Sequence, residues 1–143
     1  MQNSQICAIV PWAPVDEGPE AMSKYISLLP AEAKPLIKGF RYLLQDFASG
    51  SANPMLQAPF IDSLKWLGQN GYSFDFVVDS TVHGVQALQD VLECITKVNE
   101  GQEGDGKRTK FVLDHMGKPD LASVTGKTVH SAFLQEYERV MVG

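Results

Sequence analysis

Two kinds of apolar pattern alternate along this chain. Short apolar runs, of the kind found in buried parallel strands, occupy residues 6–10, 36–44, 72–78 and 110–114. Between and after these runs, apolar residues recur at the spacing of amphipathic helices, in residues 19–29, 60–69, 85–99 and 128–141. The predicted order β-α-β-α-β-α-β-α implies right-handed crossovers and a parallel sheet.

Four βα units form either a small open sheet or half of an eight-stranded barrel, and the pattern alone does not choose between them. A chain of 143 residues is long enough for one domain with a single core, but it is well short of the roughly 250 residues of a full (β/α)8 barrel. We therefore expect one domain over residues 1–143, in which residues 122–143 form a C-terminal helix.

Charge and composition narrow the expected partners. The formal net charge is −5 and no basic run is longer than Lys107-Arg108, so we expect a small-molecule partner and neither nucleic acid nor membrane. The N-terminus does not resemble a signal peptide, and no apolar run approaches the roughly 18 residues of a membrane span, so we expect a cytoplasmic protein. Cys7 and Cys94 are predicted to be buried thiols in a reducing compartment.

The fourth apolar run ends abruptly in residues whose side chains can bind ligands or transfer protons. Asp114, His115 and Lys118 follow it, and glycine and proline residues prevent the strand from continuing. The carboxyl ends of parallel strands are where α/β folds bind ligands, so His115 is a candidate site residue. Strand alternation would place Asp114 on the opposite side from His115. The structural alternative is a histidine that caps the strand end.

Four segments carry a resemblance to a known family. They are residues 10–12 (Val-Pro-Trp), 39–45 (Gly-Phe-Arg-Tyr-Leu-Leu-Gln), 74–76 (Phe-Asp-Phe) and 113–119 (Leu-Asp-His-Met-Gly-Lys-Pro). In this order and spacing the chain resembles the amidohydrolase-related family of metal-dependent-hydrolase-like barrels, which includes sugar lactonases and the dicarboxy-pyrone lactonase. The resemblance covers about residues 5–121. It implies a partial (β/α)8 TIM barrel of about four βα units with parallel strands.

The resemblance also implies an activity, namely hydrolysis of a lactone or a related C–O or C–N bond. His115 matches the strand-end histidine of the family, which contacts the substrate carbonyl or, in metal-using members, a divalent ion. The implied cofactor is zinc or manganese, or none. Arg41 and Gln45 match substrate-binding positions, and a guanidinium suits an anionic or polyhydroxylated substrate.

Three further residues are expected to support this site. The alternative role for Arg41 is an ion pair with Asp75 on the neighbouring strand, and we assign Asp75 mainly to that structural role. Asp114 is placed with it as a structural residue. Lys118 is expected to frame the site as a loop residue rather than to act as a base.

The chain also departs from the family pattern. It has no His-x-His pair, and His83 and His130 are most simply surface residues at helix starts. A zinc or manganese site needs about three or four protein ligands, and only His115 is a credible one. We therefore expect a fragment or truncated gene product that lacks part of the active site. The alternatives are an inactive half-barrel that self-associates through open barrel edges and, least favoured, a complete open-sheet protein, because no phosphate-binding glycine loop follows the first run.

Overall fold

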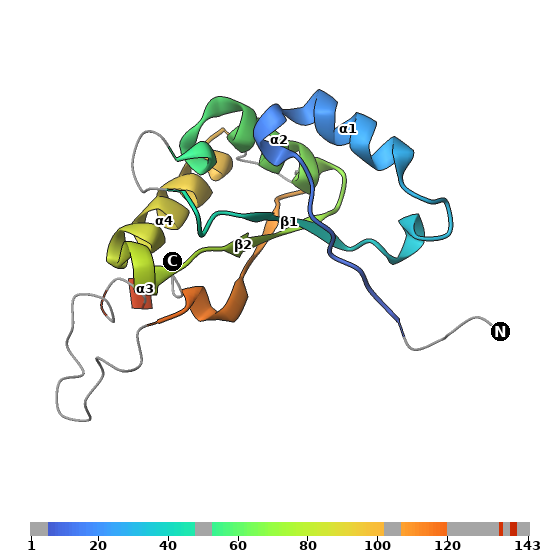
Figure 1. Cartoon of the computed structure of the whole chain (residues 1–143). Coiled ribbons are helices and arrows are strands. Elements are labelled where there is room, and N and C mark those ends of the chain that lie inside the picture. Colours follow the sequence, from blue (N-terminus) through green and yellow to red (C-terminus); the bar gives the residue numbers. More distant parts are fainter. Residues whose placement is uncertain (1–5, 48–52, 102–106, 120–134, 136–137, 140–143) are drawn as a thin grey trace.

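A computed structural model describes residues 6–47, 53–101, 107–119, 135 and 138–139 of the chain. Within them, three parallel strands form one sheet in the order β1-β2-β3 (Figure 1). The strands are β1 (Gly39–Leu43), β2 (Ser73–Val77) and β3 (Lys110–Leu113). These strands confirm three of the four predicted runs, and the crossovers between them confirm a parallel α/β fold.

The helices also match the sequence pattern. They are α1 (Pro19–Leu28), α2 (Ala58–Gln69), the short α3 (Ser80–His83) and α4 (Val85–Asn99), with 3-10 turns η1 (Val15–Glu17), η2 (Lys34–Leu36), η3 (Pro54–Leu56) and η4 (Asp114–Gly117). Both α1 and α2 have a proline in the first turn, where the missing N–H is not needed. The helix predicted from Thr128 lies almost wholly outside the described residues.

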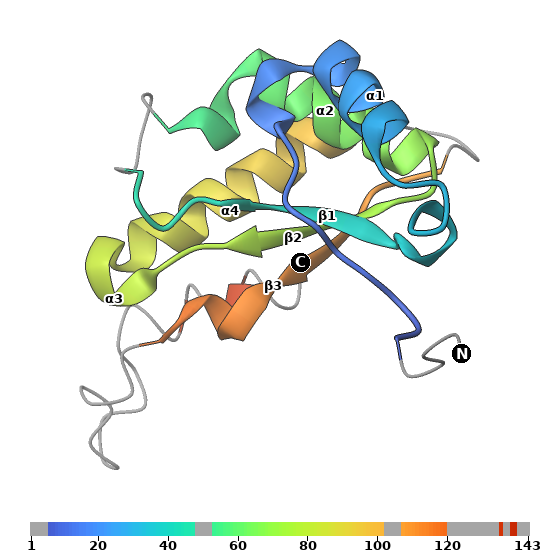
Figure 2. The same cartoon turned by 45° about the vertical axis from the view of Figure 1, so that its right-hand side comes forward.

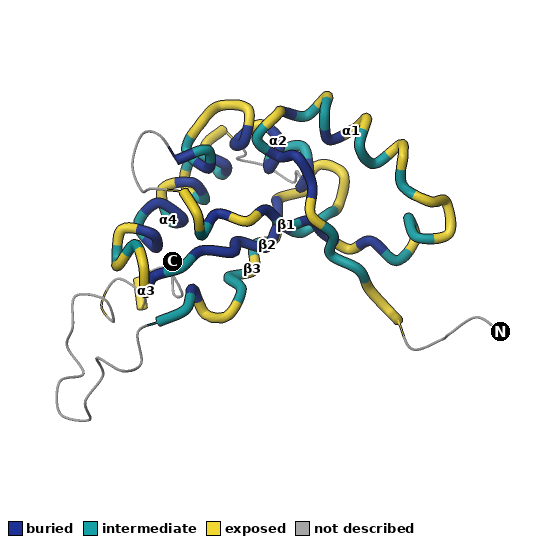
Figure 3. Tube along the Cα trace, in the orientation of Figure 1, coloured by how far each residue is buried: buried dark blue, intermediate teal, exposed yellow. Residues whose placement is uncertain are grey.

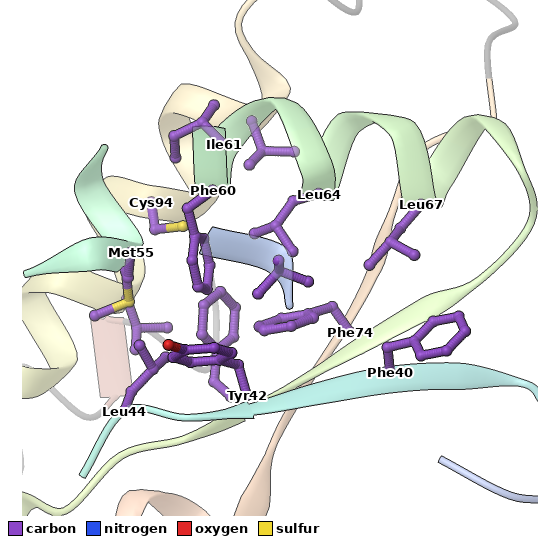
Figure 4. Packing of buried hydrophobic residues seen from close by; sticks show 14 of the residues in the cluster. Phe40, Tyr42, Leu44, Met55, Phe60, Ile61, Leu64, Leu67, Phe74 and Cys94 are labelled. Atoms are coloured by element: carbon purple, nitrogen blue, oxygen red, sulfur yellow. The ribbon is translucent and has the colours of Figure 1, made fainter. Parts of the chain in front are cut away.

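One face of the sheet is covered. Helices α1, α2 and α4 lie on the same side of the three strands, as Figure 2 shows from a second direction. Side chains that alternate towards this face, such as Phe40 and Phe74, are fully buried. They meet Phe60, Leu64 and Leu67 from α2 (Figure 4). The core therefore lies between the sheet and its helices. Within it, Phe60 and Phe74 are in edge-to-face contact, with their ring centroids 5.6 Å apart.

The opposite face of the sheet is uncovered in the described residues. Leu43 is 47% exposed and Val112 is 45% exposed on the two outer strands, whereas the central strand β2 is mostly buried, as the tube in Figure 3 shows. The fourth apolar run was expected to be buried on both faces, and this expectation is wrong. Strand β3 pairs with β2 alone and has helices on one face only.

The first apolar run, residues 6–10, does not form a regular strand, so this prediction is wrong. The segment runs beside β1 with two isolated parallel bridges, Ile9 to Ile37 and Trp12 to Arg41. The Pro11 carbonyl accepts a hydrogen bond from Arg41 N at 2.9 Å and Ala13 N donates one to the Arg41 carbonyl at 3.1 Å, but Pro11 itself has no N–H with which to continue the ladder. The expectation of a buried Cys7 also fails, because Cys7 is exposed, whereas Cys94 is buried as predicted.

Candidate active site at the carboxyl ends of the strands

Polar side chains meet where the three strands end. Gln45 follows β1, Asp79 follows β2, and Lys118 follows β3 and the turn η4. The Lys118 ammonium donates hydrogen bonds to Gln45 Oε1 and to Asp79 Oδ2, each at 2.9 Å. One side chain thus ties three strand-end loops together. The role of Lys118 in framing a site stays a prediction, to which these contacts are relevant.

The backbone of η4 is strained. His115, Met116, Gly117 and Lys118 are consecutive residues with positive φ, between 51° and 68°. Left-handed conformations cost about 1–2 kcal/mol for each residue with a Cβ, and strain of this kind is concentrated at functional sites. Gly117 is needed here because a Cβ would lie 2.9 Å from Leu88 Cδ2.

The position of His115 follows from this turn and not from strand alternation. Regular strand geometry ends at Leu113, so the alternation argument that set the direction of His115 is wrong. The His115 side chain is exposed, and no hydrogen bond to another described residue fixes its imidazole. It therefore stands next to the loop cluster as an accessible imidazole that a bound molecule can reach.

Arg41 lies on the uncovered face of the sheet, between two carboxylates. Its Nη2 is 3.0 Å from Asp75 Oδ2 and 3.2 Å from Asp114 Oδ2. The ion pair with Asp75, foreseen as the structural alternative for Arg41, is present, and Asp114 is a second partner that was not foreseen. Burial raises the pKa of Asp75, and the hydrogen bond from Arg41 opposes this rise. The three side chains together carry a formal charge of −1.

Asp79 is a site residue that the sequence reasoning missed. It caps α3 by accepting a hydrogen bond from Thr81 N at 3.0 Å, and it also accepts one from the Thr81 hydroxyl. These bonds and the one from Lys118 lower the pKa of Asp79 to about 2. Its signal in the sequence is an aspartate directly after a buried strand and two residues before a threonine.

The remaining histidines differ from expectation. His83 ends α3 instead of beginning a helix, and it is half-buried, with Nε2 2.9 Å from the backbone oxygen of Gln45. His130 lies outside the described residues. Within the part of the chain that the structure describes, no group of three or more histidine, cysteine, aspartate or glutamate side chains could hold a metal ion. His115 therefore belongs to no such group there, and these residues do not by themselves form a zinc or manganese site.

A parallel βα sheet whose polar residues gather at the carboxyl ends of its strands is typical of α/β proteins, both open sheets and barrels. The chain matches a crystal structure of an amidohydrolase from Burkholderia multivorans with bound zinc, with a TM-score of 0.64 and 23% identity, over 97% of this chain and 40% of that one. The fold is thus part of a (β/α)8 barrel. The described residues contain no helix of sufficient length and apolarity to cross a membrane.

The sequence comparison gives the family. The chain is 32% identical over 122 residues to an L-rhamnono-gamma-lactonase from Scheffersomyces stipitis, which covers 81% of this chain and 32% of that protein. No family model matches the chain. The chain belongs to the amidohydrolase-related family. It spans about a third of the length of the curated relative.

Proposed function

We propose that this protein acts as a hydrolase that opens the ring of a small lactone. The observation that carries the proposal is the cluster of Gln45, Asp79 and Lys118, which joins the ends of three parallel strands beside the strained turn of His115. This is the edge at which barrel enzymes perform chemistry. The similarity to a lactonase supports the proposal that the hydrolysed bond is the ester bond of a lactone.

The substrate that fits best is neutral and carries hydroxyl groups. The Arg41 guanidinium is already shared by Asp75 and Asp114, so a carboxylate substrate would approach a cluster of net charge −1. The Lys118 ammonium is likewise neutralised by Asp79. Carboxylates and the Gln45 amide accept or exchange hydrogen bonds with hydroxyl groups without such repulsion. We therefore favour a sugar lactone over an anionic one.

The reaction would be addition of water to the lactone carbonyl. The water oxygen forms a bond to the carbonyl carbon, the bond from that carbon to the ring oxygen breaks, and the proton that the water loses is balanced by the one that the ring oxygen takes up, which gives a hydroxy acid. In this proposal His115 donates a hydrogen bond to the carbonyl oxygen, and Arg41 and Gln45 orient the hydroxyl groups. The described residues do not form a metal site, and no step of this proposal requires zinc or manganese.

The test supplies the barrel segments that the chain does not share with its relative. This chain is co-expressed with the unmatched segments of the lactonase, and hydrolysis of L-rhamnono-γ-lactone is followed in a pH-stat, with and without added zinc. We expect activity in the purified complex and a loss of about 100-fold or more for His115→Ala, in line with the loss of one hydrogen bond to the developing oxyanion. His130→Ala is the matched control. A stable complex without lactonase activity would contradict the proposal.

A second candidate function is a non-catalytic module that self-associates. The observation that favours it is the uncovered sheet face, on which Leu43 and Val112 are about half exposed. Sedimentation at increasing concentration should then show a dimer that Val112→Lys abolishes. Leu28→Lys, at a 76% exposed position on α1, is the control. A monomer at every concentration would exclude this candidate.

A further inference from the structure

The turn that follows β3 is held at both ends by side chains from other strands. At its start, the Asp114 carboxylate lies 3.2 Å from Nη2 of Arg41 on β1. At its end, the Lys118 ammonium lies 2.9 Å from Oδ2 of Asp79, in the loop that follows β2. We propose that the ion pair between Asp79 and Lys118 keeps this turn in its left-handed conformation and thereby sets the direction of the His115 imidazole.

The backbone of the turn needs support from outside. His115, Met116 and Lys118 each carry a Cβ and have φ values between 51° and 55°, where the Cβ lies too close to the following carbonyl oxygen. Side-chain-bearing residues normally visit this region singly and not in succession. Within the turn, Lys118 N donates a hydrogen bond to the His115 carbonyl at 3.0 Å. Strained backbone of this kind persists only where the surrounding structure enforces it.

The two groups that bind Lys118 are themselves fixed. The Asp79 carboxylate accepts hydrogen bonds from Thr81 N, at 3.0 Å, and from the Thr81 hydroxyl, and its side chain is only 15% exposed. The second acceptor is Gln45 Oε1, at 2.9 Å, and the backbone oxygen of the same residue lies 2.9 Å from His83 Nε2. Both acceptors are thus joined to α3, so the Lys118 ammonium binds to positions that this helix already holds.

Packing alone does not explain the turn. Gly117 is buried against α4, where a Cβ would lie 2.9 Å from Leu88 Cδ2, but glycine adopts a positive φ without strain. The strained residues before it have outward side chains, because Met116 is 59% exposed and His115 is also exposed. Burial of these two side chains therefore cannot offset the strain. The hydrogen bonds of Lys118 are the printed side-chain contacts that act at this end of the turn.

The consequence for catalysis rests on the proposed lactonase function. The Cα–Cβ bond of a residue takes its direction from the backbone, so relaxation of position 115 to a negative φ would point the imidazole elsewhere. A displacement of about 1 Å in a reacting group can lower a rate about 100-fold. Asp79 and Lys118 are positioning residues in this proposal, since they act through His115 and not on the substrate.

The test of the turn uses the full chain and needs no substrate. A residue with positive φ gives a strong NOE between its own Hα and N–H, and the hydrogen bond to the His115 carbonyl protects the N–H at position 118 from exchange. In Lys118→Met the NOEs at positions 115 and 116 should weaken. Amide exchange at position 118 should accelerate about tenfold, as expected for the loss of a charge-assisted hydrogen bond.

Two further variants make this test specific. Asp79→Asn keeps an oxygen that can cap Thr81 and removes the charge that binds Lys118, so it should reproduce the effects of Lys118→Met. Lys97→Met breaks the exposed ion pair with Glu93 on α4 and should change neither the NOEs nor the exchange. Unchanged NOEs and exchange in Asp79→Asn would overturn the proposal, even if Lys118→Met does not fold. An equal effect of Lys97→Met would also overturn it.

The effect on catalysis is measured separately, in the complex with the lactonase segments. Lys118→Met should lower kcat about tenfold and leave KM nearly unchanged, because the imidazole is displaced but still present. The double variant His115→Ala/Lys118→Met should be no slower than His115→Ala alone, because the ion pair acts only through the imidazole. A further loss in the double variant would overturn the positioning role. An inactive complex combined with weakened NOEs in Lys118→Met would contradict the lactonase function and support the role of the ion pair in the turn.

Discussion

Replacement of Arg41 by methionine tests the electrostatic role of the uncovered sheet face. Methionine keeps an unbranched side chain of similar length and removes the charge, so Asp75 and Asp114 lose their shared cation. Removal of one partner from a fully buried ion pair costs about 3–5 kcal/mol, and an exposed pair contributes below about 1 kcal/mol. The side-chain exposure is 38% for Arg41 and 7% for Asp75. We therefore expect Arg41→Met to lower the free energy of unfolding by about 2–3 kcal/mol at neutral pH.

The loss should depend on pH in a specified direction. Burial raises the pKa of Asp75 above its ordinary value of 3.8, and the Arg41 hydrogen bond limits the rise. An acid whose pKa is raised in the folded state contributes stability below its unfolded pKa, and this contribution disappears as the pH rises through the folded pKa. Without Arg41 the pKa of Asp75 rises further. The destabilisation should be greatest near pH 7 and should shrink as the pH falls towards 4.

Urea unfolding followed by tryptophan fluorescence, at pH 7.5 and pH 5, measures both effects. Lys24→Met on α1 is the control for loss of one positive charge. Asp75→Asn in the Arg41→Met background should recover part of the stability, because a neutral amide needs no cation. A loss below about 0.5 kcal/mol at pH 7.5, the range of ordinary surface changes, would refute the reasoning. So would an equal loss at both pH values.

Two further predictions concern packing. Gly68→Ala should reduce the free energy of unfolding by about 1–3 kcal/mol in urea titrations, because the new Cβ would collide with Thr109 N at 2.4 Å, whereas Gln69→Ala should change it by less than about 0.5 kcal/mol. In the folded chain, Cys7 should react with a disulfide reagent and Cys94 should not, because burial raises the pKa of the Cys94 thiol. Rapid reaction of both cysteine thiols in the absence of denaturant would contradict the second prediction.

The elements that the sequence predicted are those in which apolar spacing and end signals agree. Helix α2 is an example, because its apolar spacing continues to Leu67, the helix ends at Gln69, and Gly71 then adopts a positive φ of 80°. Residues 6–10 satisfy the strand pattern, but Pro11 lacks the N–H that a regular ladder needs, and apolar spacing does not register this lack. The exposure of Val112 depends on what covers the sheet, which strand periodicity does not encode.

Some contacts of the candidate site could be predicted from the sequence and others could not. Arg41 and Asp75 occupy the same row of adjacent strands, so their pairing was foreseeable from the order of the predicted strands. The contact from Lys118 to Asp79 depends on four residues with positive φ, only one of which is glycine. Residue type gives little warning of left-handed backbone at histidine, methionine or lysine. The roles of His115, Arg41 and Gln45 in catalysis stay predictions.

The order of the strands in the sheet has a consequence for biosynthesis. It is the same as their order in the chain, and the core lies outside the sheet, against α2 and α4, not in a closed barrel interior. A growing chain can therefore add each strand to the edge left by the previous one as it leaves the ribosome, and each helix can then seal the face behind it. The described strands and helices therefore need no closed ring of strands in order to pack.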